Sequence, residues 1–175
     1  QNWSMIKSLY DGLMDYRPGT TDLRPGLAEN YSVSDDGMVF TFKIRPGVKF
    51  HNGREMSAED VKYSLDRVTN PVTQSPGAGF FASINGFDAI SNGETDTLSG
   101  VSVIDPLTLK ITLSRPDATF LHVMGLNFAS VVAKEAVEQA GADFGKTAMG
   151  TGAFKLGEWT IGQRLVFERN ENYWR

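Results

Sequence analysis

The sequence predicts an α+β fold, and three observations lead to this prediction. The two-residue period of half-buried strands recurs in three separate hairpin-like stretches. Stretches with helical periodicity lie between them, but strands and helices do not alternate in the β-α-β order of a doubly wound fold. The chain has 175 residues, of which 41% are hydrophobic and 22% are charged, which is typical of a globular domain with a sizeable core.

The chain is expected to begin with a helix that runs to about residue 14, because five apolar residues share one helical stripe. These residues are Met5, Ile6, Leu9, Leu13 and Met14. Residues 17–19, Arg-Pro-Gly, should stop this helix, and the two proline–glycine pairs at residues 18–19 and 25–26 mark a looped connection.

The strongest local pattern is the strict alternation of apolar and polar residues over residues 38–45. Its apolar face consists of Met38, Phe40, Phe42 and Ile44. Turn residues precede it, so we expect a hairpin with a partner strand around Tyr31. In this register Phe42 should be buried and Lys43 exposed.

A second helix is predicted to begin after Ser57, which is a suitable N-cap. Glu59 and Asp60 place negative charge in its first turn, where the helix dipole favours it. The following region, residues 71–100, is rich in Gly, Ser, Thr and Asn. We expect it to be irregular and exposed, with one short helix within residues 80–92.

Two further hairpins are predicted in the second half of the chain. Residues 100–105 should pair with residues 108–113, and residues 153–159 with residues 164–169.

Short elements should connect these two hairpins. Asp117 is expected to cap a helix that runs to about Gly125, and Val131 should lie in a short extended segment. Residues 134–140 have the pattern of a helix that ends at Gly141.

Composition excludes several classes of function. The net charge of −4 and the lack of a basic cluster argue against nucleic acid as a partner. The absence of cysteine excludes disulfides, thiolate nucleophiles and zinc–thiolate sites. The longest apolar stretch, residues 120–133, is too short and too interrupted to span a membrane. No leader peptide is visible at Gln1, which fits a mature chain, an excised piece or a cytoplasmic protein.

No catalytic motif is recognisable from residue types and spacing. His51 and His122 stand alone, outside any metal-binding pattern, and no Gly-x-Ser-x-Gly motif occurs. The Gly-Thr-Gly of residues 150–152 lacks the third glycine of a dinucleotide loop and precedes a strand. The residues themselves therefore predict a globular α+β domain that is not an enzyme and holds neither a cofactor nor a metal.

Several stretches resemble one protein family, and they follow one another in the order typical of that family. The stretches are residues 9–13, 25–31, 34–53, 57–65, 108–113, 150–156 and 169–174. Together they resemble the extracytoplasmic solute-binding proteins of family 5, the receptors of peptide, nickel and opine ABC importers.

The resemblance implies a lobe like those of type II periplasmic binding proteins, with a mixed sheet and an inserted hairpin-rich subdomain. Members of this family are longer than this chain and close two lobes on a solute. Residues 1–175 correspond to a truncated first lobe, and the second lobe is absent. Roughly residues 12–115 would form the inserted subdomain, whereas residues 1–11 and 116–175 would belong to the sheet of the main lobe.

The resemblance also implies where the solute would be bound. The candidate residues lie at the start of the first helix, before the segment at Val131, and on a loop that faces the cleft in some relatives. They are Asn2, Trp3, Asn127, Phe128, Ala129 and, on the loop, Phe81. Trp3 and Phe128 would form apolar walls, and Asn127 would supply a directional hydrogen bond. Alternatively, Trp3 packs on its own helix and Phe128 belongs to the core.

The implied function is a monomeric receptor that captures a di- or oligopeptide and delivers it to an ABC permease in the inner membrane. Such a receptor is periplasmic, or lipid-anchored outside the cytoplasmic membrane, and has no cofactor. A nickel complex, an opine or an oligosaccharide is an alternative solute. Two alternatives of other classes are a hydrolase built on a binding-protein scaffold and a module that docks on a sensor or permease.

Overall fold

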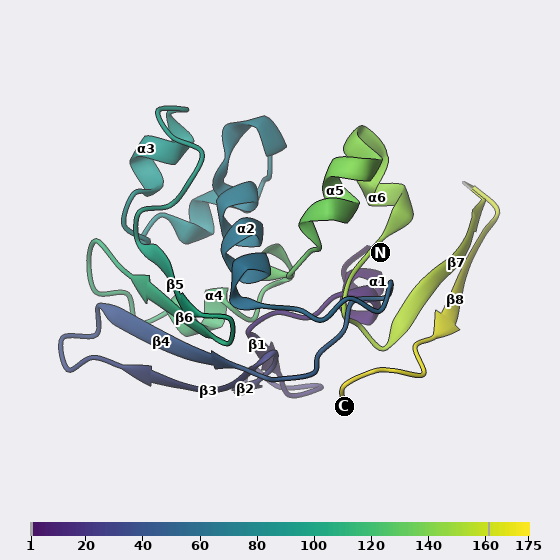
Figure 1. The fold of residues 1–175 in the computed structure, drawn as a ribbon, viewed down its shortest axis with the longest axis horizontal. Helices are drawn as coiled ribbons and strands as arrows, with labels where there is room; N and C mark the ends of the chain where they lie inside the picture. The colour runs from purple at the N-terminus through teal and green to yellow at the C-terminus, as the bar shows by residue number, and fades with distance from the viewer. Residues whose placement is uncertain (1, 161) are drawn as a thin grey trace.

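The computed structural model describes the backbone of residues 2–160 and 162–175, and the side chains of residues 5–160 and 162–175. It has an α+β architecture, as predicted from the sequence. A four-stranded sheet with helices α2 and α3 on one side occupies one half of the molecule (Figure 1). Helices α1, α5 and α6 and a separate hairpin, β7–β8, occupy the other half.

The four-stranded sheet has the strand order β3-β4-β6-β5, and its pairings are antiparallel. Tyr31 lies opposite Phe42, Phe42 is fully buried and Lys43 is exposed, which confirms the predicted register. Leu109 and Ile111 extend the same buried face. The strands are β3 (Ala28–Val33), β4 (Val39–Ile44), β5 (Val101–Asp105) and β6 (Thr108–Thr112).

Helix α2 (Ala58–Thr69) covers this buried face, and its sequence explains both its start and its orientation. The carboxylate of Asp60 accepts a hydrogen bond of 2.9 Å from the backbone N–H of Ser57, as expected for a capping box. Val61 and Leu65 are buried against the sheet, so α2 closes the core of this half.

The first helix is shorter than predicted. Helix α1 (Asn2–Leu9) ends before Leu13, and Met14 begins a strand. The backbone of this segment pairs with other segments instead of continuing the helix, because Leu13 accepts a hydrogen bond from Gly26 and Met14 donates one to Met124. Both side chains still reach the core, which is why they fitted an apolar stripe.

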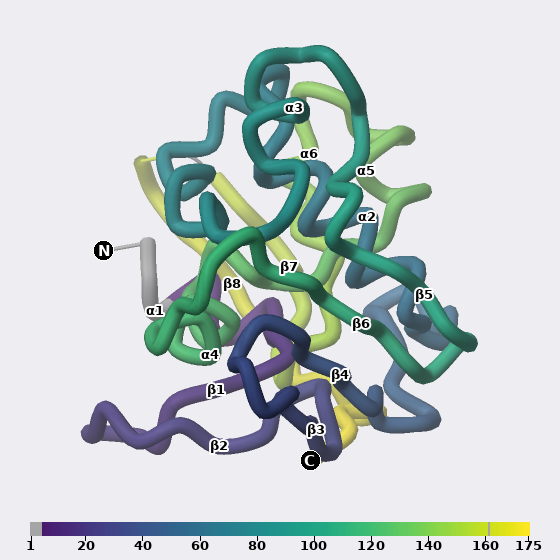
Figure 2. Tube along the Cα trace, turned by 90° about the vertical axis from the view of Figure 1, so that its left-hand side faces the viewer, coloured from purple at the N-terminus to yellow at the C-terminus, as the bar shows by residue number. Residues whose placement is uncertain are grey.

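Strands β1 (Met14–Tyr16) and β2 (Leu23–Pro25) form a two-stranded ribbon that projects from the lower edge of the molecule (Figure 2). The proline–glycine pair at residues 18–19 lies in its turn, where Gly19 has a φ of +75°. Proline and glycine suit such a turn because they favour the fixed and the positive φ angles respectively.

The expectation for residues 71–100 holds only in part: many of these residues are exposed and a short helix forms within residues 80–92, but several apolar side chains are buried. This region contains η1 (Pro71–Thr73), η2 (Ala78–Phe81) and α3 (Phe87–Ser91), and it closes one end of the core. Its fully or almost fully buried apolar residues are Phe81, Ile84, Ile90 and Leu98. The sequence did not predict these residues as part of the core, because they are too widely spaced in a polar segment to form a period.

The second half of the chain follows the prediction more closely. The helix after Asp117 is only one turn long, but helix α5 ends at Gly141 and the last hairpin forms as expected. The elements are α4 (Phe120–Val123), η3 (Asn127–Ala129), α5 (Lys134–Ala140), η4 (Gly141–Asp143), α6 (Phe144–Thr147), β7 (Phe154–Thr160) and β8 (Arg164–Arg169).

The mixed sheet that the family resemblance implied is not formed among the described strands, where every pairing is antiparallel. Strands β7 and β8 pair only with each other in this part of the chain, and Val131 and Val132 are extended outside any strand. In the described residues, no helix has the length and apolar character needed to cross a membrane.

Candidate functional site

A largely apolar pocket of about 400 Å³ lies where helix α1 meets η3, helix α6 and the β7–β8 hairpin. Met5, Ile6 and Leu9 of α1 line one side of it. Phe144 of α6 and Trp159 of β7 also line it. A concave apolar surface of this size is typical of a site for a small organic ligand or a peptide side chain.

A few polar groups are placed among these apolar walls. Arg67 of α2 lies with its guanidinium carbon 5.4 Å from the ring centroid of Phe144, which is within the range of a cation–π contact. Burial raises the pKa of Tyr10 to about 12, so its phenol stays neutral at physiological pH. Ser75 and Asn127 also line the pocket. These groups can orient a ligand through hydrogen bonds.

Two of the predicted ligand residues meet at this pocket. Asn127 and Phe128 both belong to η3 and both line it, next to the helix α1 that was expected to share the site. The ring of Phe128 also packs against the core. Phe128 therefore lines a pocket on one side and belongs partly to the core on another. Whether these two residues contact a solute stays a prediction.

The other predicted residues are not brought to the pocket in the same way. Phe81 has no exposed surface and belongs to the core, so its side chain does not face a cleft. Ala129 is buried as well, and only its backbone is a candidate for ligand contact. Asn2 and Trp3 lie in helix α1, but their side chains are outside the described residues.

An aromatic residue that the sequence reasoning missed lies beside Phe128. Phe80 is 50% exposed, and its ring stacks on that of Phe128 with a centroid distance of 5.7 Å and an interplanar angle of 26°. Phe80 and Phe81 are adjacent in an irregular segment, so no period in the sequence decides which of the two is buried. The prediction selected the neighbour that became part of the core.

The Gly-Thr-Gly motif and His51 are structural. A Cβ atom on Gly150 would lie 2.1 Å from the carbonyl oxygen of Leu9, and one on Gly152 would lie 2.4 Å from that of Ser8. Glycine at these positions lets the backbone lie directly against helix α1. The His51 ring is placed between the two glycines, with Nε2 3.1 Å from the oxygen of Gly152 and Nδ1 3.4 Å from the nitrogen of Gly150.

His122 lies elsewhere in the structure, with its Nδ1 3.5 Å from the phenol oxygen of Tyr16. In the part of the chain that the structure describes, no group of three or more His, Cys, Asp or Glu residues is placed to hold a metal ion.

A second, more polar pocket of about 330 Å³ lies near the β1–β2 ribbon and contains two aspartates. Asp11 accepts hydrogen bonds from Thr151 Oγ1 at 3.0 Å, Tyr173 Oη at 3.3 Å and Trp174 Nε1 at 3.0 Å. Burial alone would raise the pKa of Asp15, but hydrogen bonds from Arg175 and Arg24 outweigh it, and the pKa is lowered. The hydrogen bonds of Asp11 and Asp15 therefore attach the last residues of the chain to strand β1 and to the segment before it.

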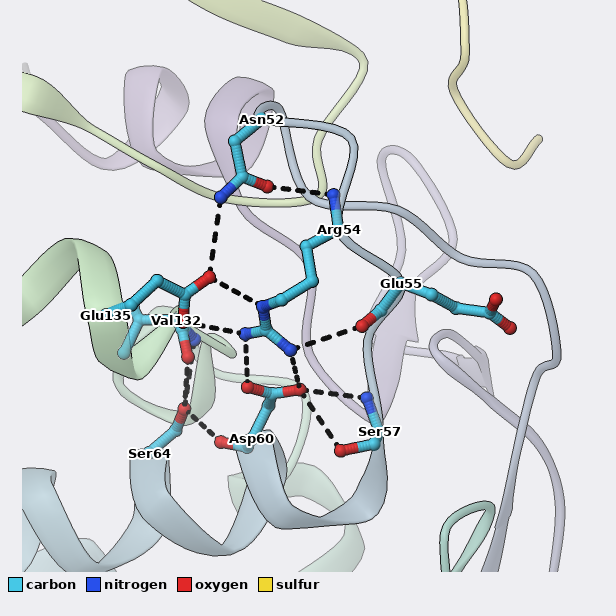
Figure 3. A network of polar contacts seen from close by, with 8 residues as sticks. All are labelled: Asn52, Arg54, Glu55, Ser57, Asp60, Ser64, Val132 and Glu135. Atoms are coloured by element: carbon cyan, nitrogen blue, oxygen red, sulfur yellow. Dashed lines mark hydrogen bonds and ion pairs between the residues drawn. The ribbon is translucent and has the colours of Figure 1, made fainter.

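A polar network joins helix α5 to the start of helix α2 (Figure 3). The guanidinium of Arg54 donates two hydrogen bonds to Asp60, at 3.0 and 2.6 Å, and two to Glu135, at 2.6 and 3.0 Å. Ser64 Oγ accepts a hydrogen bond of 2.9 Å from the backbone N–H of Val132. The network fixes the segment that leads from η3 through α5 to α6, and thereby one wall of the apolar pocket.

Comparison with known proteins identifies the family. The sequence model for the middle region of bacterial extracellular solute-binding proteins, family 5, matches residues 22–175. The chain belongs to this family.

The curated relatives in family 5 include several binding proteins. The chain is 34% identical to the dipeptide-binding protein of Escherichia coli, in an alignment that covers 95% of this chain and 32% of that protein. It is 32% identical to heme-binding protein A of Haemophilus influenzae, over 97% of this chain and 32% of that protein. The chain thus spans about a third of the length of the curated relatives it matches.

Solved structures of family 5 proteins have the same fold. The murein tripeptide-binding protein MppA of Escherichia coli matches with a TM-score of 0.89 and 33% identity, over 98% of this chain and 34% of that chain. OppA of Haemophilus influenzae in complex with the peptide RPPGFSPFR matches with a TM-score of 0.89 and 26% identity, over 97% of this chain and 34% of that chain.

Proposed function

We propose that this chain is the first lobe of a receptor that captures a peptide-like solute for an ABC importer. The observation that carries the proposal is the apolar pocket in which Asn127 and Phe128 lie together next to helix α1. The similarity to MppA and to the peptide complex of OppA supports a peptide as the solute. An extended peptide can be held through its backbone while its side chains occupy pockets.

We further propose the remaining features of such a receptor. Residues 12–115 form the inserted subdomain, and residues 1–11 and 116–175 belong to the main lobe. The receptor acts as a monomer outside the cytoplasmic membrane, in the periplasm or held by a lipid anchor, and it delivers its solute to a permease. Nucleic acid is not among its partners.

Haem, an opine or a metal complex is the alternative class of solute. Heme-binding protein A and a structure of AgaA in complex with agropinic acid are both similar to this chain. The largely apolar lining of the pocket favours apolar peptide side chains over opines and charged metal complexes.

Calorimetric titration tests the proposal. The full-length protein that carries this chain and residues 1–175 alone are each titrated with a mixed library of di- to pentapeptides. We expect saturable binding only by the full-length protein, because the second lobe supplies the other half of the contacts. Losing half of about −8 kcal/mol leaves an affinity of about 1 mM. Submicromolar binding by residues 1–175 alone would contradict a shared cleft, and no binding by the full-length protein would contradict a peptide receptor.

An activity assay tests the receptor against the hydrolase alternative. The purified protein should hydrolyse neither peptides nor esters above the rate in buffer, since no nucleophile–base pair was found in the sequence. Hydrolysis that disappears in His51→Ala or His122→Ala would establish the alternative instead. Co-purification with a sensor in the absence of solute binding would favour the docking module.

A further inference from the structure

Phe80 and Phe128 form an aromatic pair of which one ring is largely exposed. Phe128 is partly covered by the core, whereas Phe80 leaves half of its surface exposed. An exposed ring held face to face with a second ring offers a flat apolar surface to a ligand. Such a surface at the edge of a pocket is a reason to look for a binding role.

The local backbone is built to hold the second ring in place. A Cβ atom on Gly77 would lie 2.2 to 2.6 Å from three atoms of the Phe128 ring, so this ring can lie flat on the η2 segment only because residue 77 is glycine. Gly77 has a φ of −95°, which any residue can adopt. The requirement for glycine at this position therefore comes from the ring and not from the turn.

The pair also stands next to groups that can bind a peptide backbone. Phe128 lines the apolar pocket together with Asn127 of η3 and with Thr73 and Ser75, which precede Gly77. Phe80 continues this wall outward through its stack on Phe128. A ligand whose backbone bonds to the polar groups would thus place a side chain against the two rings.

We propose that Phe80 and Phe128 form a subsite for an apolar or aromatic side chain of the bound peptide, and that Phe80 sets the preference for that side chain. This proposal rests on the proposed function as a peptide receptor. Stacking or apolar contact with an exposed ring should favour phenylalanine over alanine at one position of the peptide by roughly three- to tenfold.

Titration calorimetry on the full-length protein tests this subsite with defined peptides. The probes are trialanine and the three tripeptides in which one alanine is replaced by phenylalanine. The wild type should prefer phenylalanine at one position, and Phe80→Ala should abolish that preference, so that the affinity for the preferred peptide falls to that for trialanine. Phe80→Trp should retain the preference because indole can form the same stack.

Two further variants make the test specific. Phe154→Ala removes a phenylalanine of similar exposure, 40%, from β7 outside the apolar pocket, and it should leave the preference unchanged. Gly77→Ala should displace the Phe128 ring and reduce the preference although Phe80 is intact.

The outcomes separate this proposal from the proposed function. A preference for phenylalanine that survives in Phe80→Ala overturns the subsite and leaves the receptor in place. Equal weakening of all four peptides in Phe80→Ala also overturns it, because it would mean that Phe80 packs against another part of the protein. If no tripeptide binds to the wild type although the di- to pentapeptide library does, the subsite is refuted and the receptor stands; if neither binds, both are refuted.

Discussion

At the scale of the residue, His51 shows how backbone groups select one protonation state of a side chain. Its Nε2 faces the carbonyl oxygen of Gly152, which requires a proton on the ring, and its Nδ1 faces the N–H of Gly150, which requires a lone pair. Only the neutral ring with its proton on Nε2 satisfies both neighbours. Burial lowers the pKa of His51 in agreement with this geometry.

The protonation state of His51 should make the stability of the chain depend on pH. Because the folded-state pKa lies below the unfolded value of 6.5, the stabilisation is complete above pH 6.5 and is lost as the pH falls through the folded-state pKa. Urea unfolding at a pH of about 7.5 and of about 5 should show a larger loss for the wild type than for His51→Gln, which does not titrate. Equal losses would mean that His51 does not contribute to acid sensitivity.

Individual residues were predictable where a period connected them to their neighbours. Strict alternation decided that Phe42 is buried and Lys43 exposed, because a change of register by one residue would move every side chain to the other face. No such period applies to Phe80 and Phe81, and only the tertiary structure decides between them. For the same reason the sequence indicated Asn127 and Phe128 only through the family resemblance.

At the scale of the element, helix α5 depends on its polar contacts. None of its residues is buried, so apolar packing contributes little to its position. Its main attachment is Glu135, whose pKa is lowered chiefly by the hydrogen bonds from Arg54. The same guanidinium neutralises Asp60, whose side chain is only 6% exposed. Arg54 thus holds two helices at once (Figure 3).

Mutations in this network should distinguish the stability contributed by the Arg54–Glu135 contact from that contributed by the Arg54–Asp60 contact. Glu135→Gln breaks an exposed contact and should cost about 0.5 kcal/mol, while Arg54→Ala leaves Asp60 buried without its cation and should cost about 1–3 kcal/mol. Both variants should speed amide hydrogen exchange in residues 134–140. Glu138→Gln removes the exposed partner of Lys134 on the same helix and serves as the control. Exchange that is unchanged in Arg54→Ala would show that α5 is held by other contacts.

Elements were predictable where local signals and tertiary structure agreed. Strand β4 and helix α5 carry their own start and stop signals and were predicted within one residue. Helix α1 was predicted too long because the backbone of Leu13 and Met14 pairs with distant segments, and hydrogen bonds of this kind leave no local trace. The core residues of the 71–100 region were missed because they are too widely spaced to form a period.

At the scale of the whole molecule, the β7–β8 hairpin is a separate two-stranded sheet that is only partly covered by the rest of the chain. It pairs with no third strand among the described residues, and Trp159 and Phe154 are 46% and 40% exposed. Isolated two-stranded sheets are marginally stable in water. The hairpin nevertheless forms a wall of the apolar pocket, so the order of the pocket depends on it.

If this chain is one lobe of a larger protein, as we propose, its amide hydrogen exchange should differ between residues 1–175 alone and the full-length protein. In residues 1–175 alone, the amides of β7 and β8 should exchange faster than those of the four-stranded sheet, which packs against α2. In the full-length protein the hairpin should be protected, since additional chain would cover its apolar side chains. The four-stranded sheet provides the internal control, because its protection should be similar in both proteins. A hairpin that is equally protected in both would show that it needs no further support.

The contacts of Asp11 have a consequence for the order in which the chain is completed during synthesis. Its three side-chain partners, Thr151, Tyr173 and Trp174, follow it by 140, 162 and 163 positions. A ribosome that has made Asp11 must therefore produce nearly the whole chain before this carboxylate meets its last partner. Until then water solvates the carboxylate. Asp11 is thus translated long before the residues that complete its final surroundings.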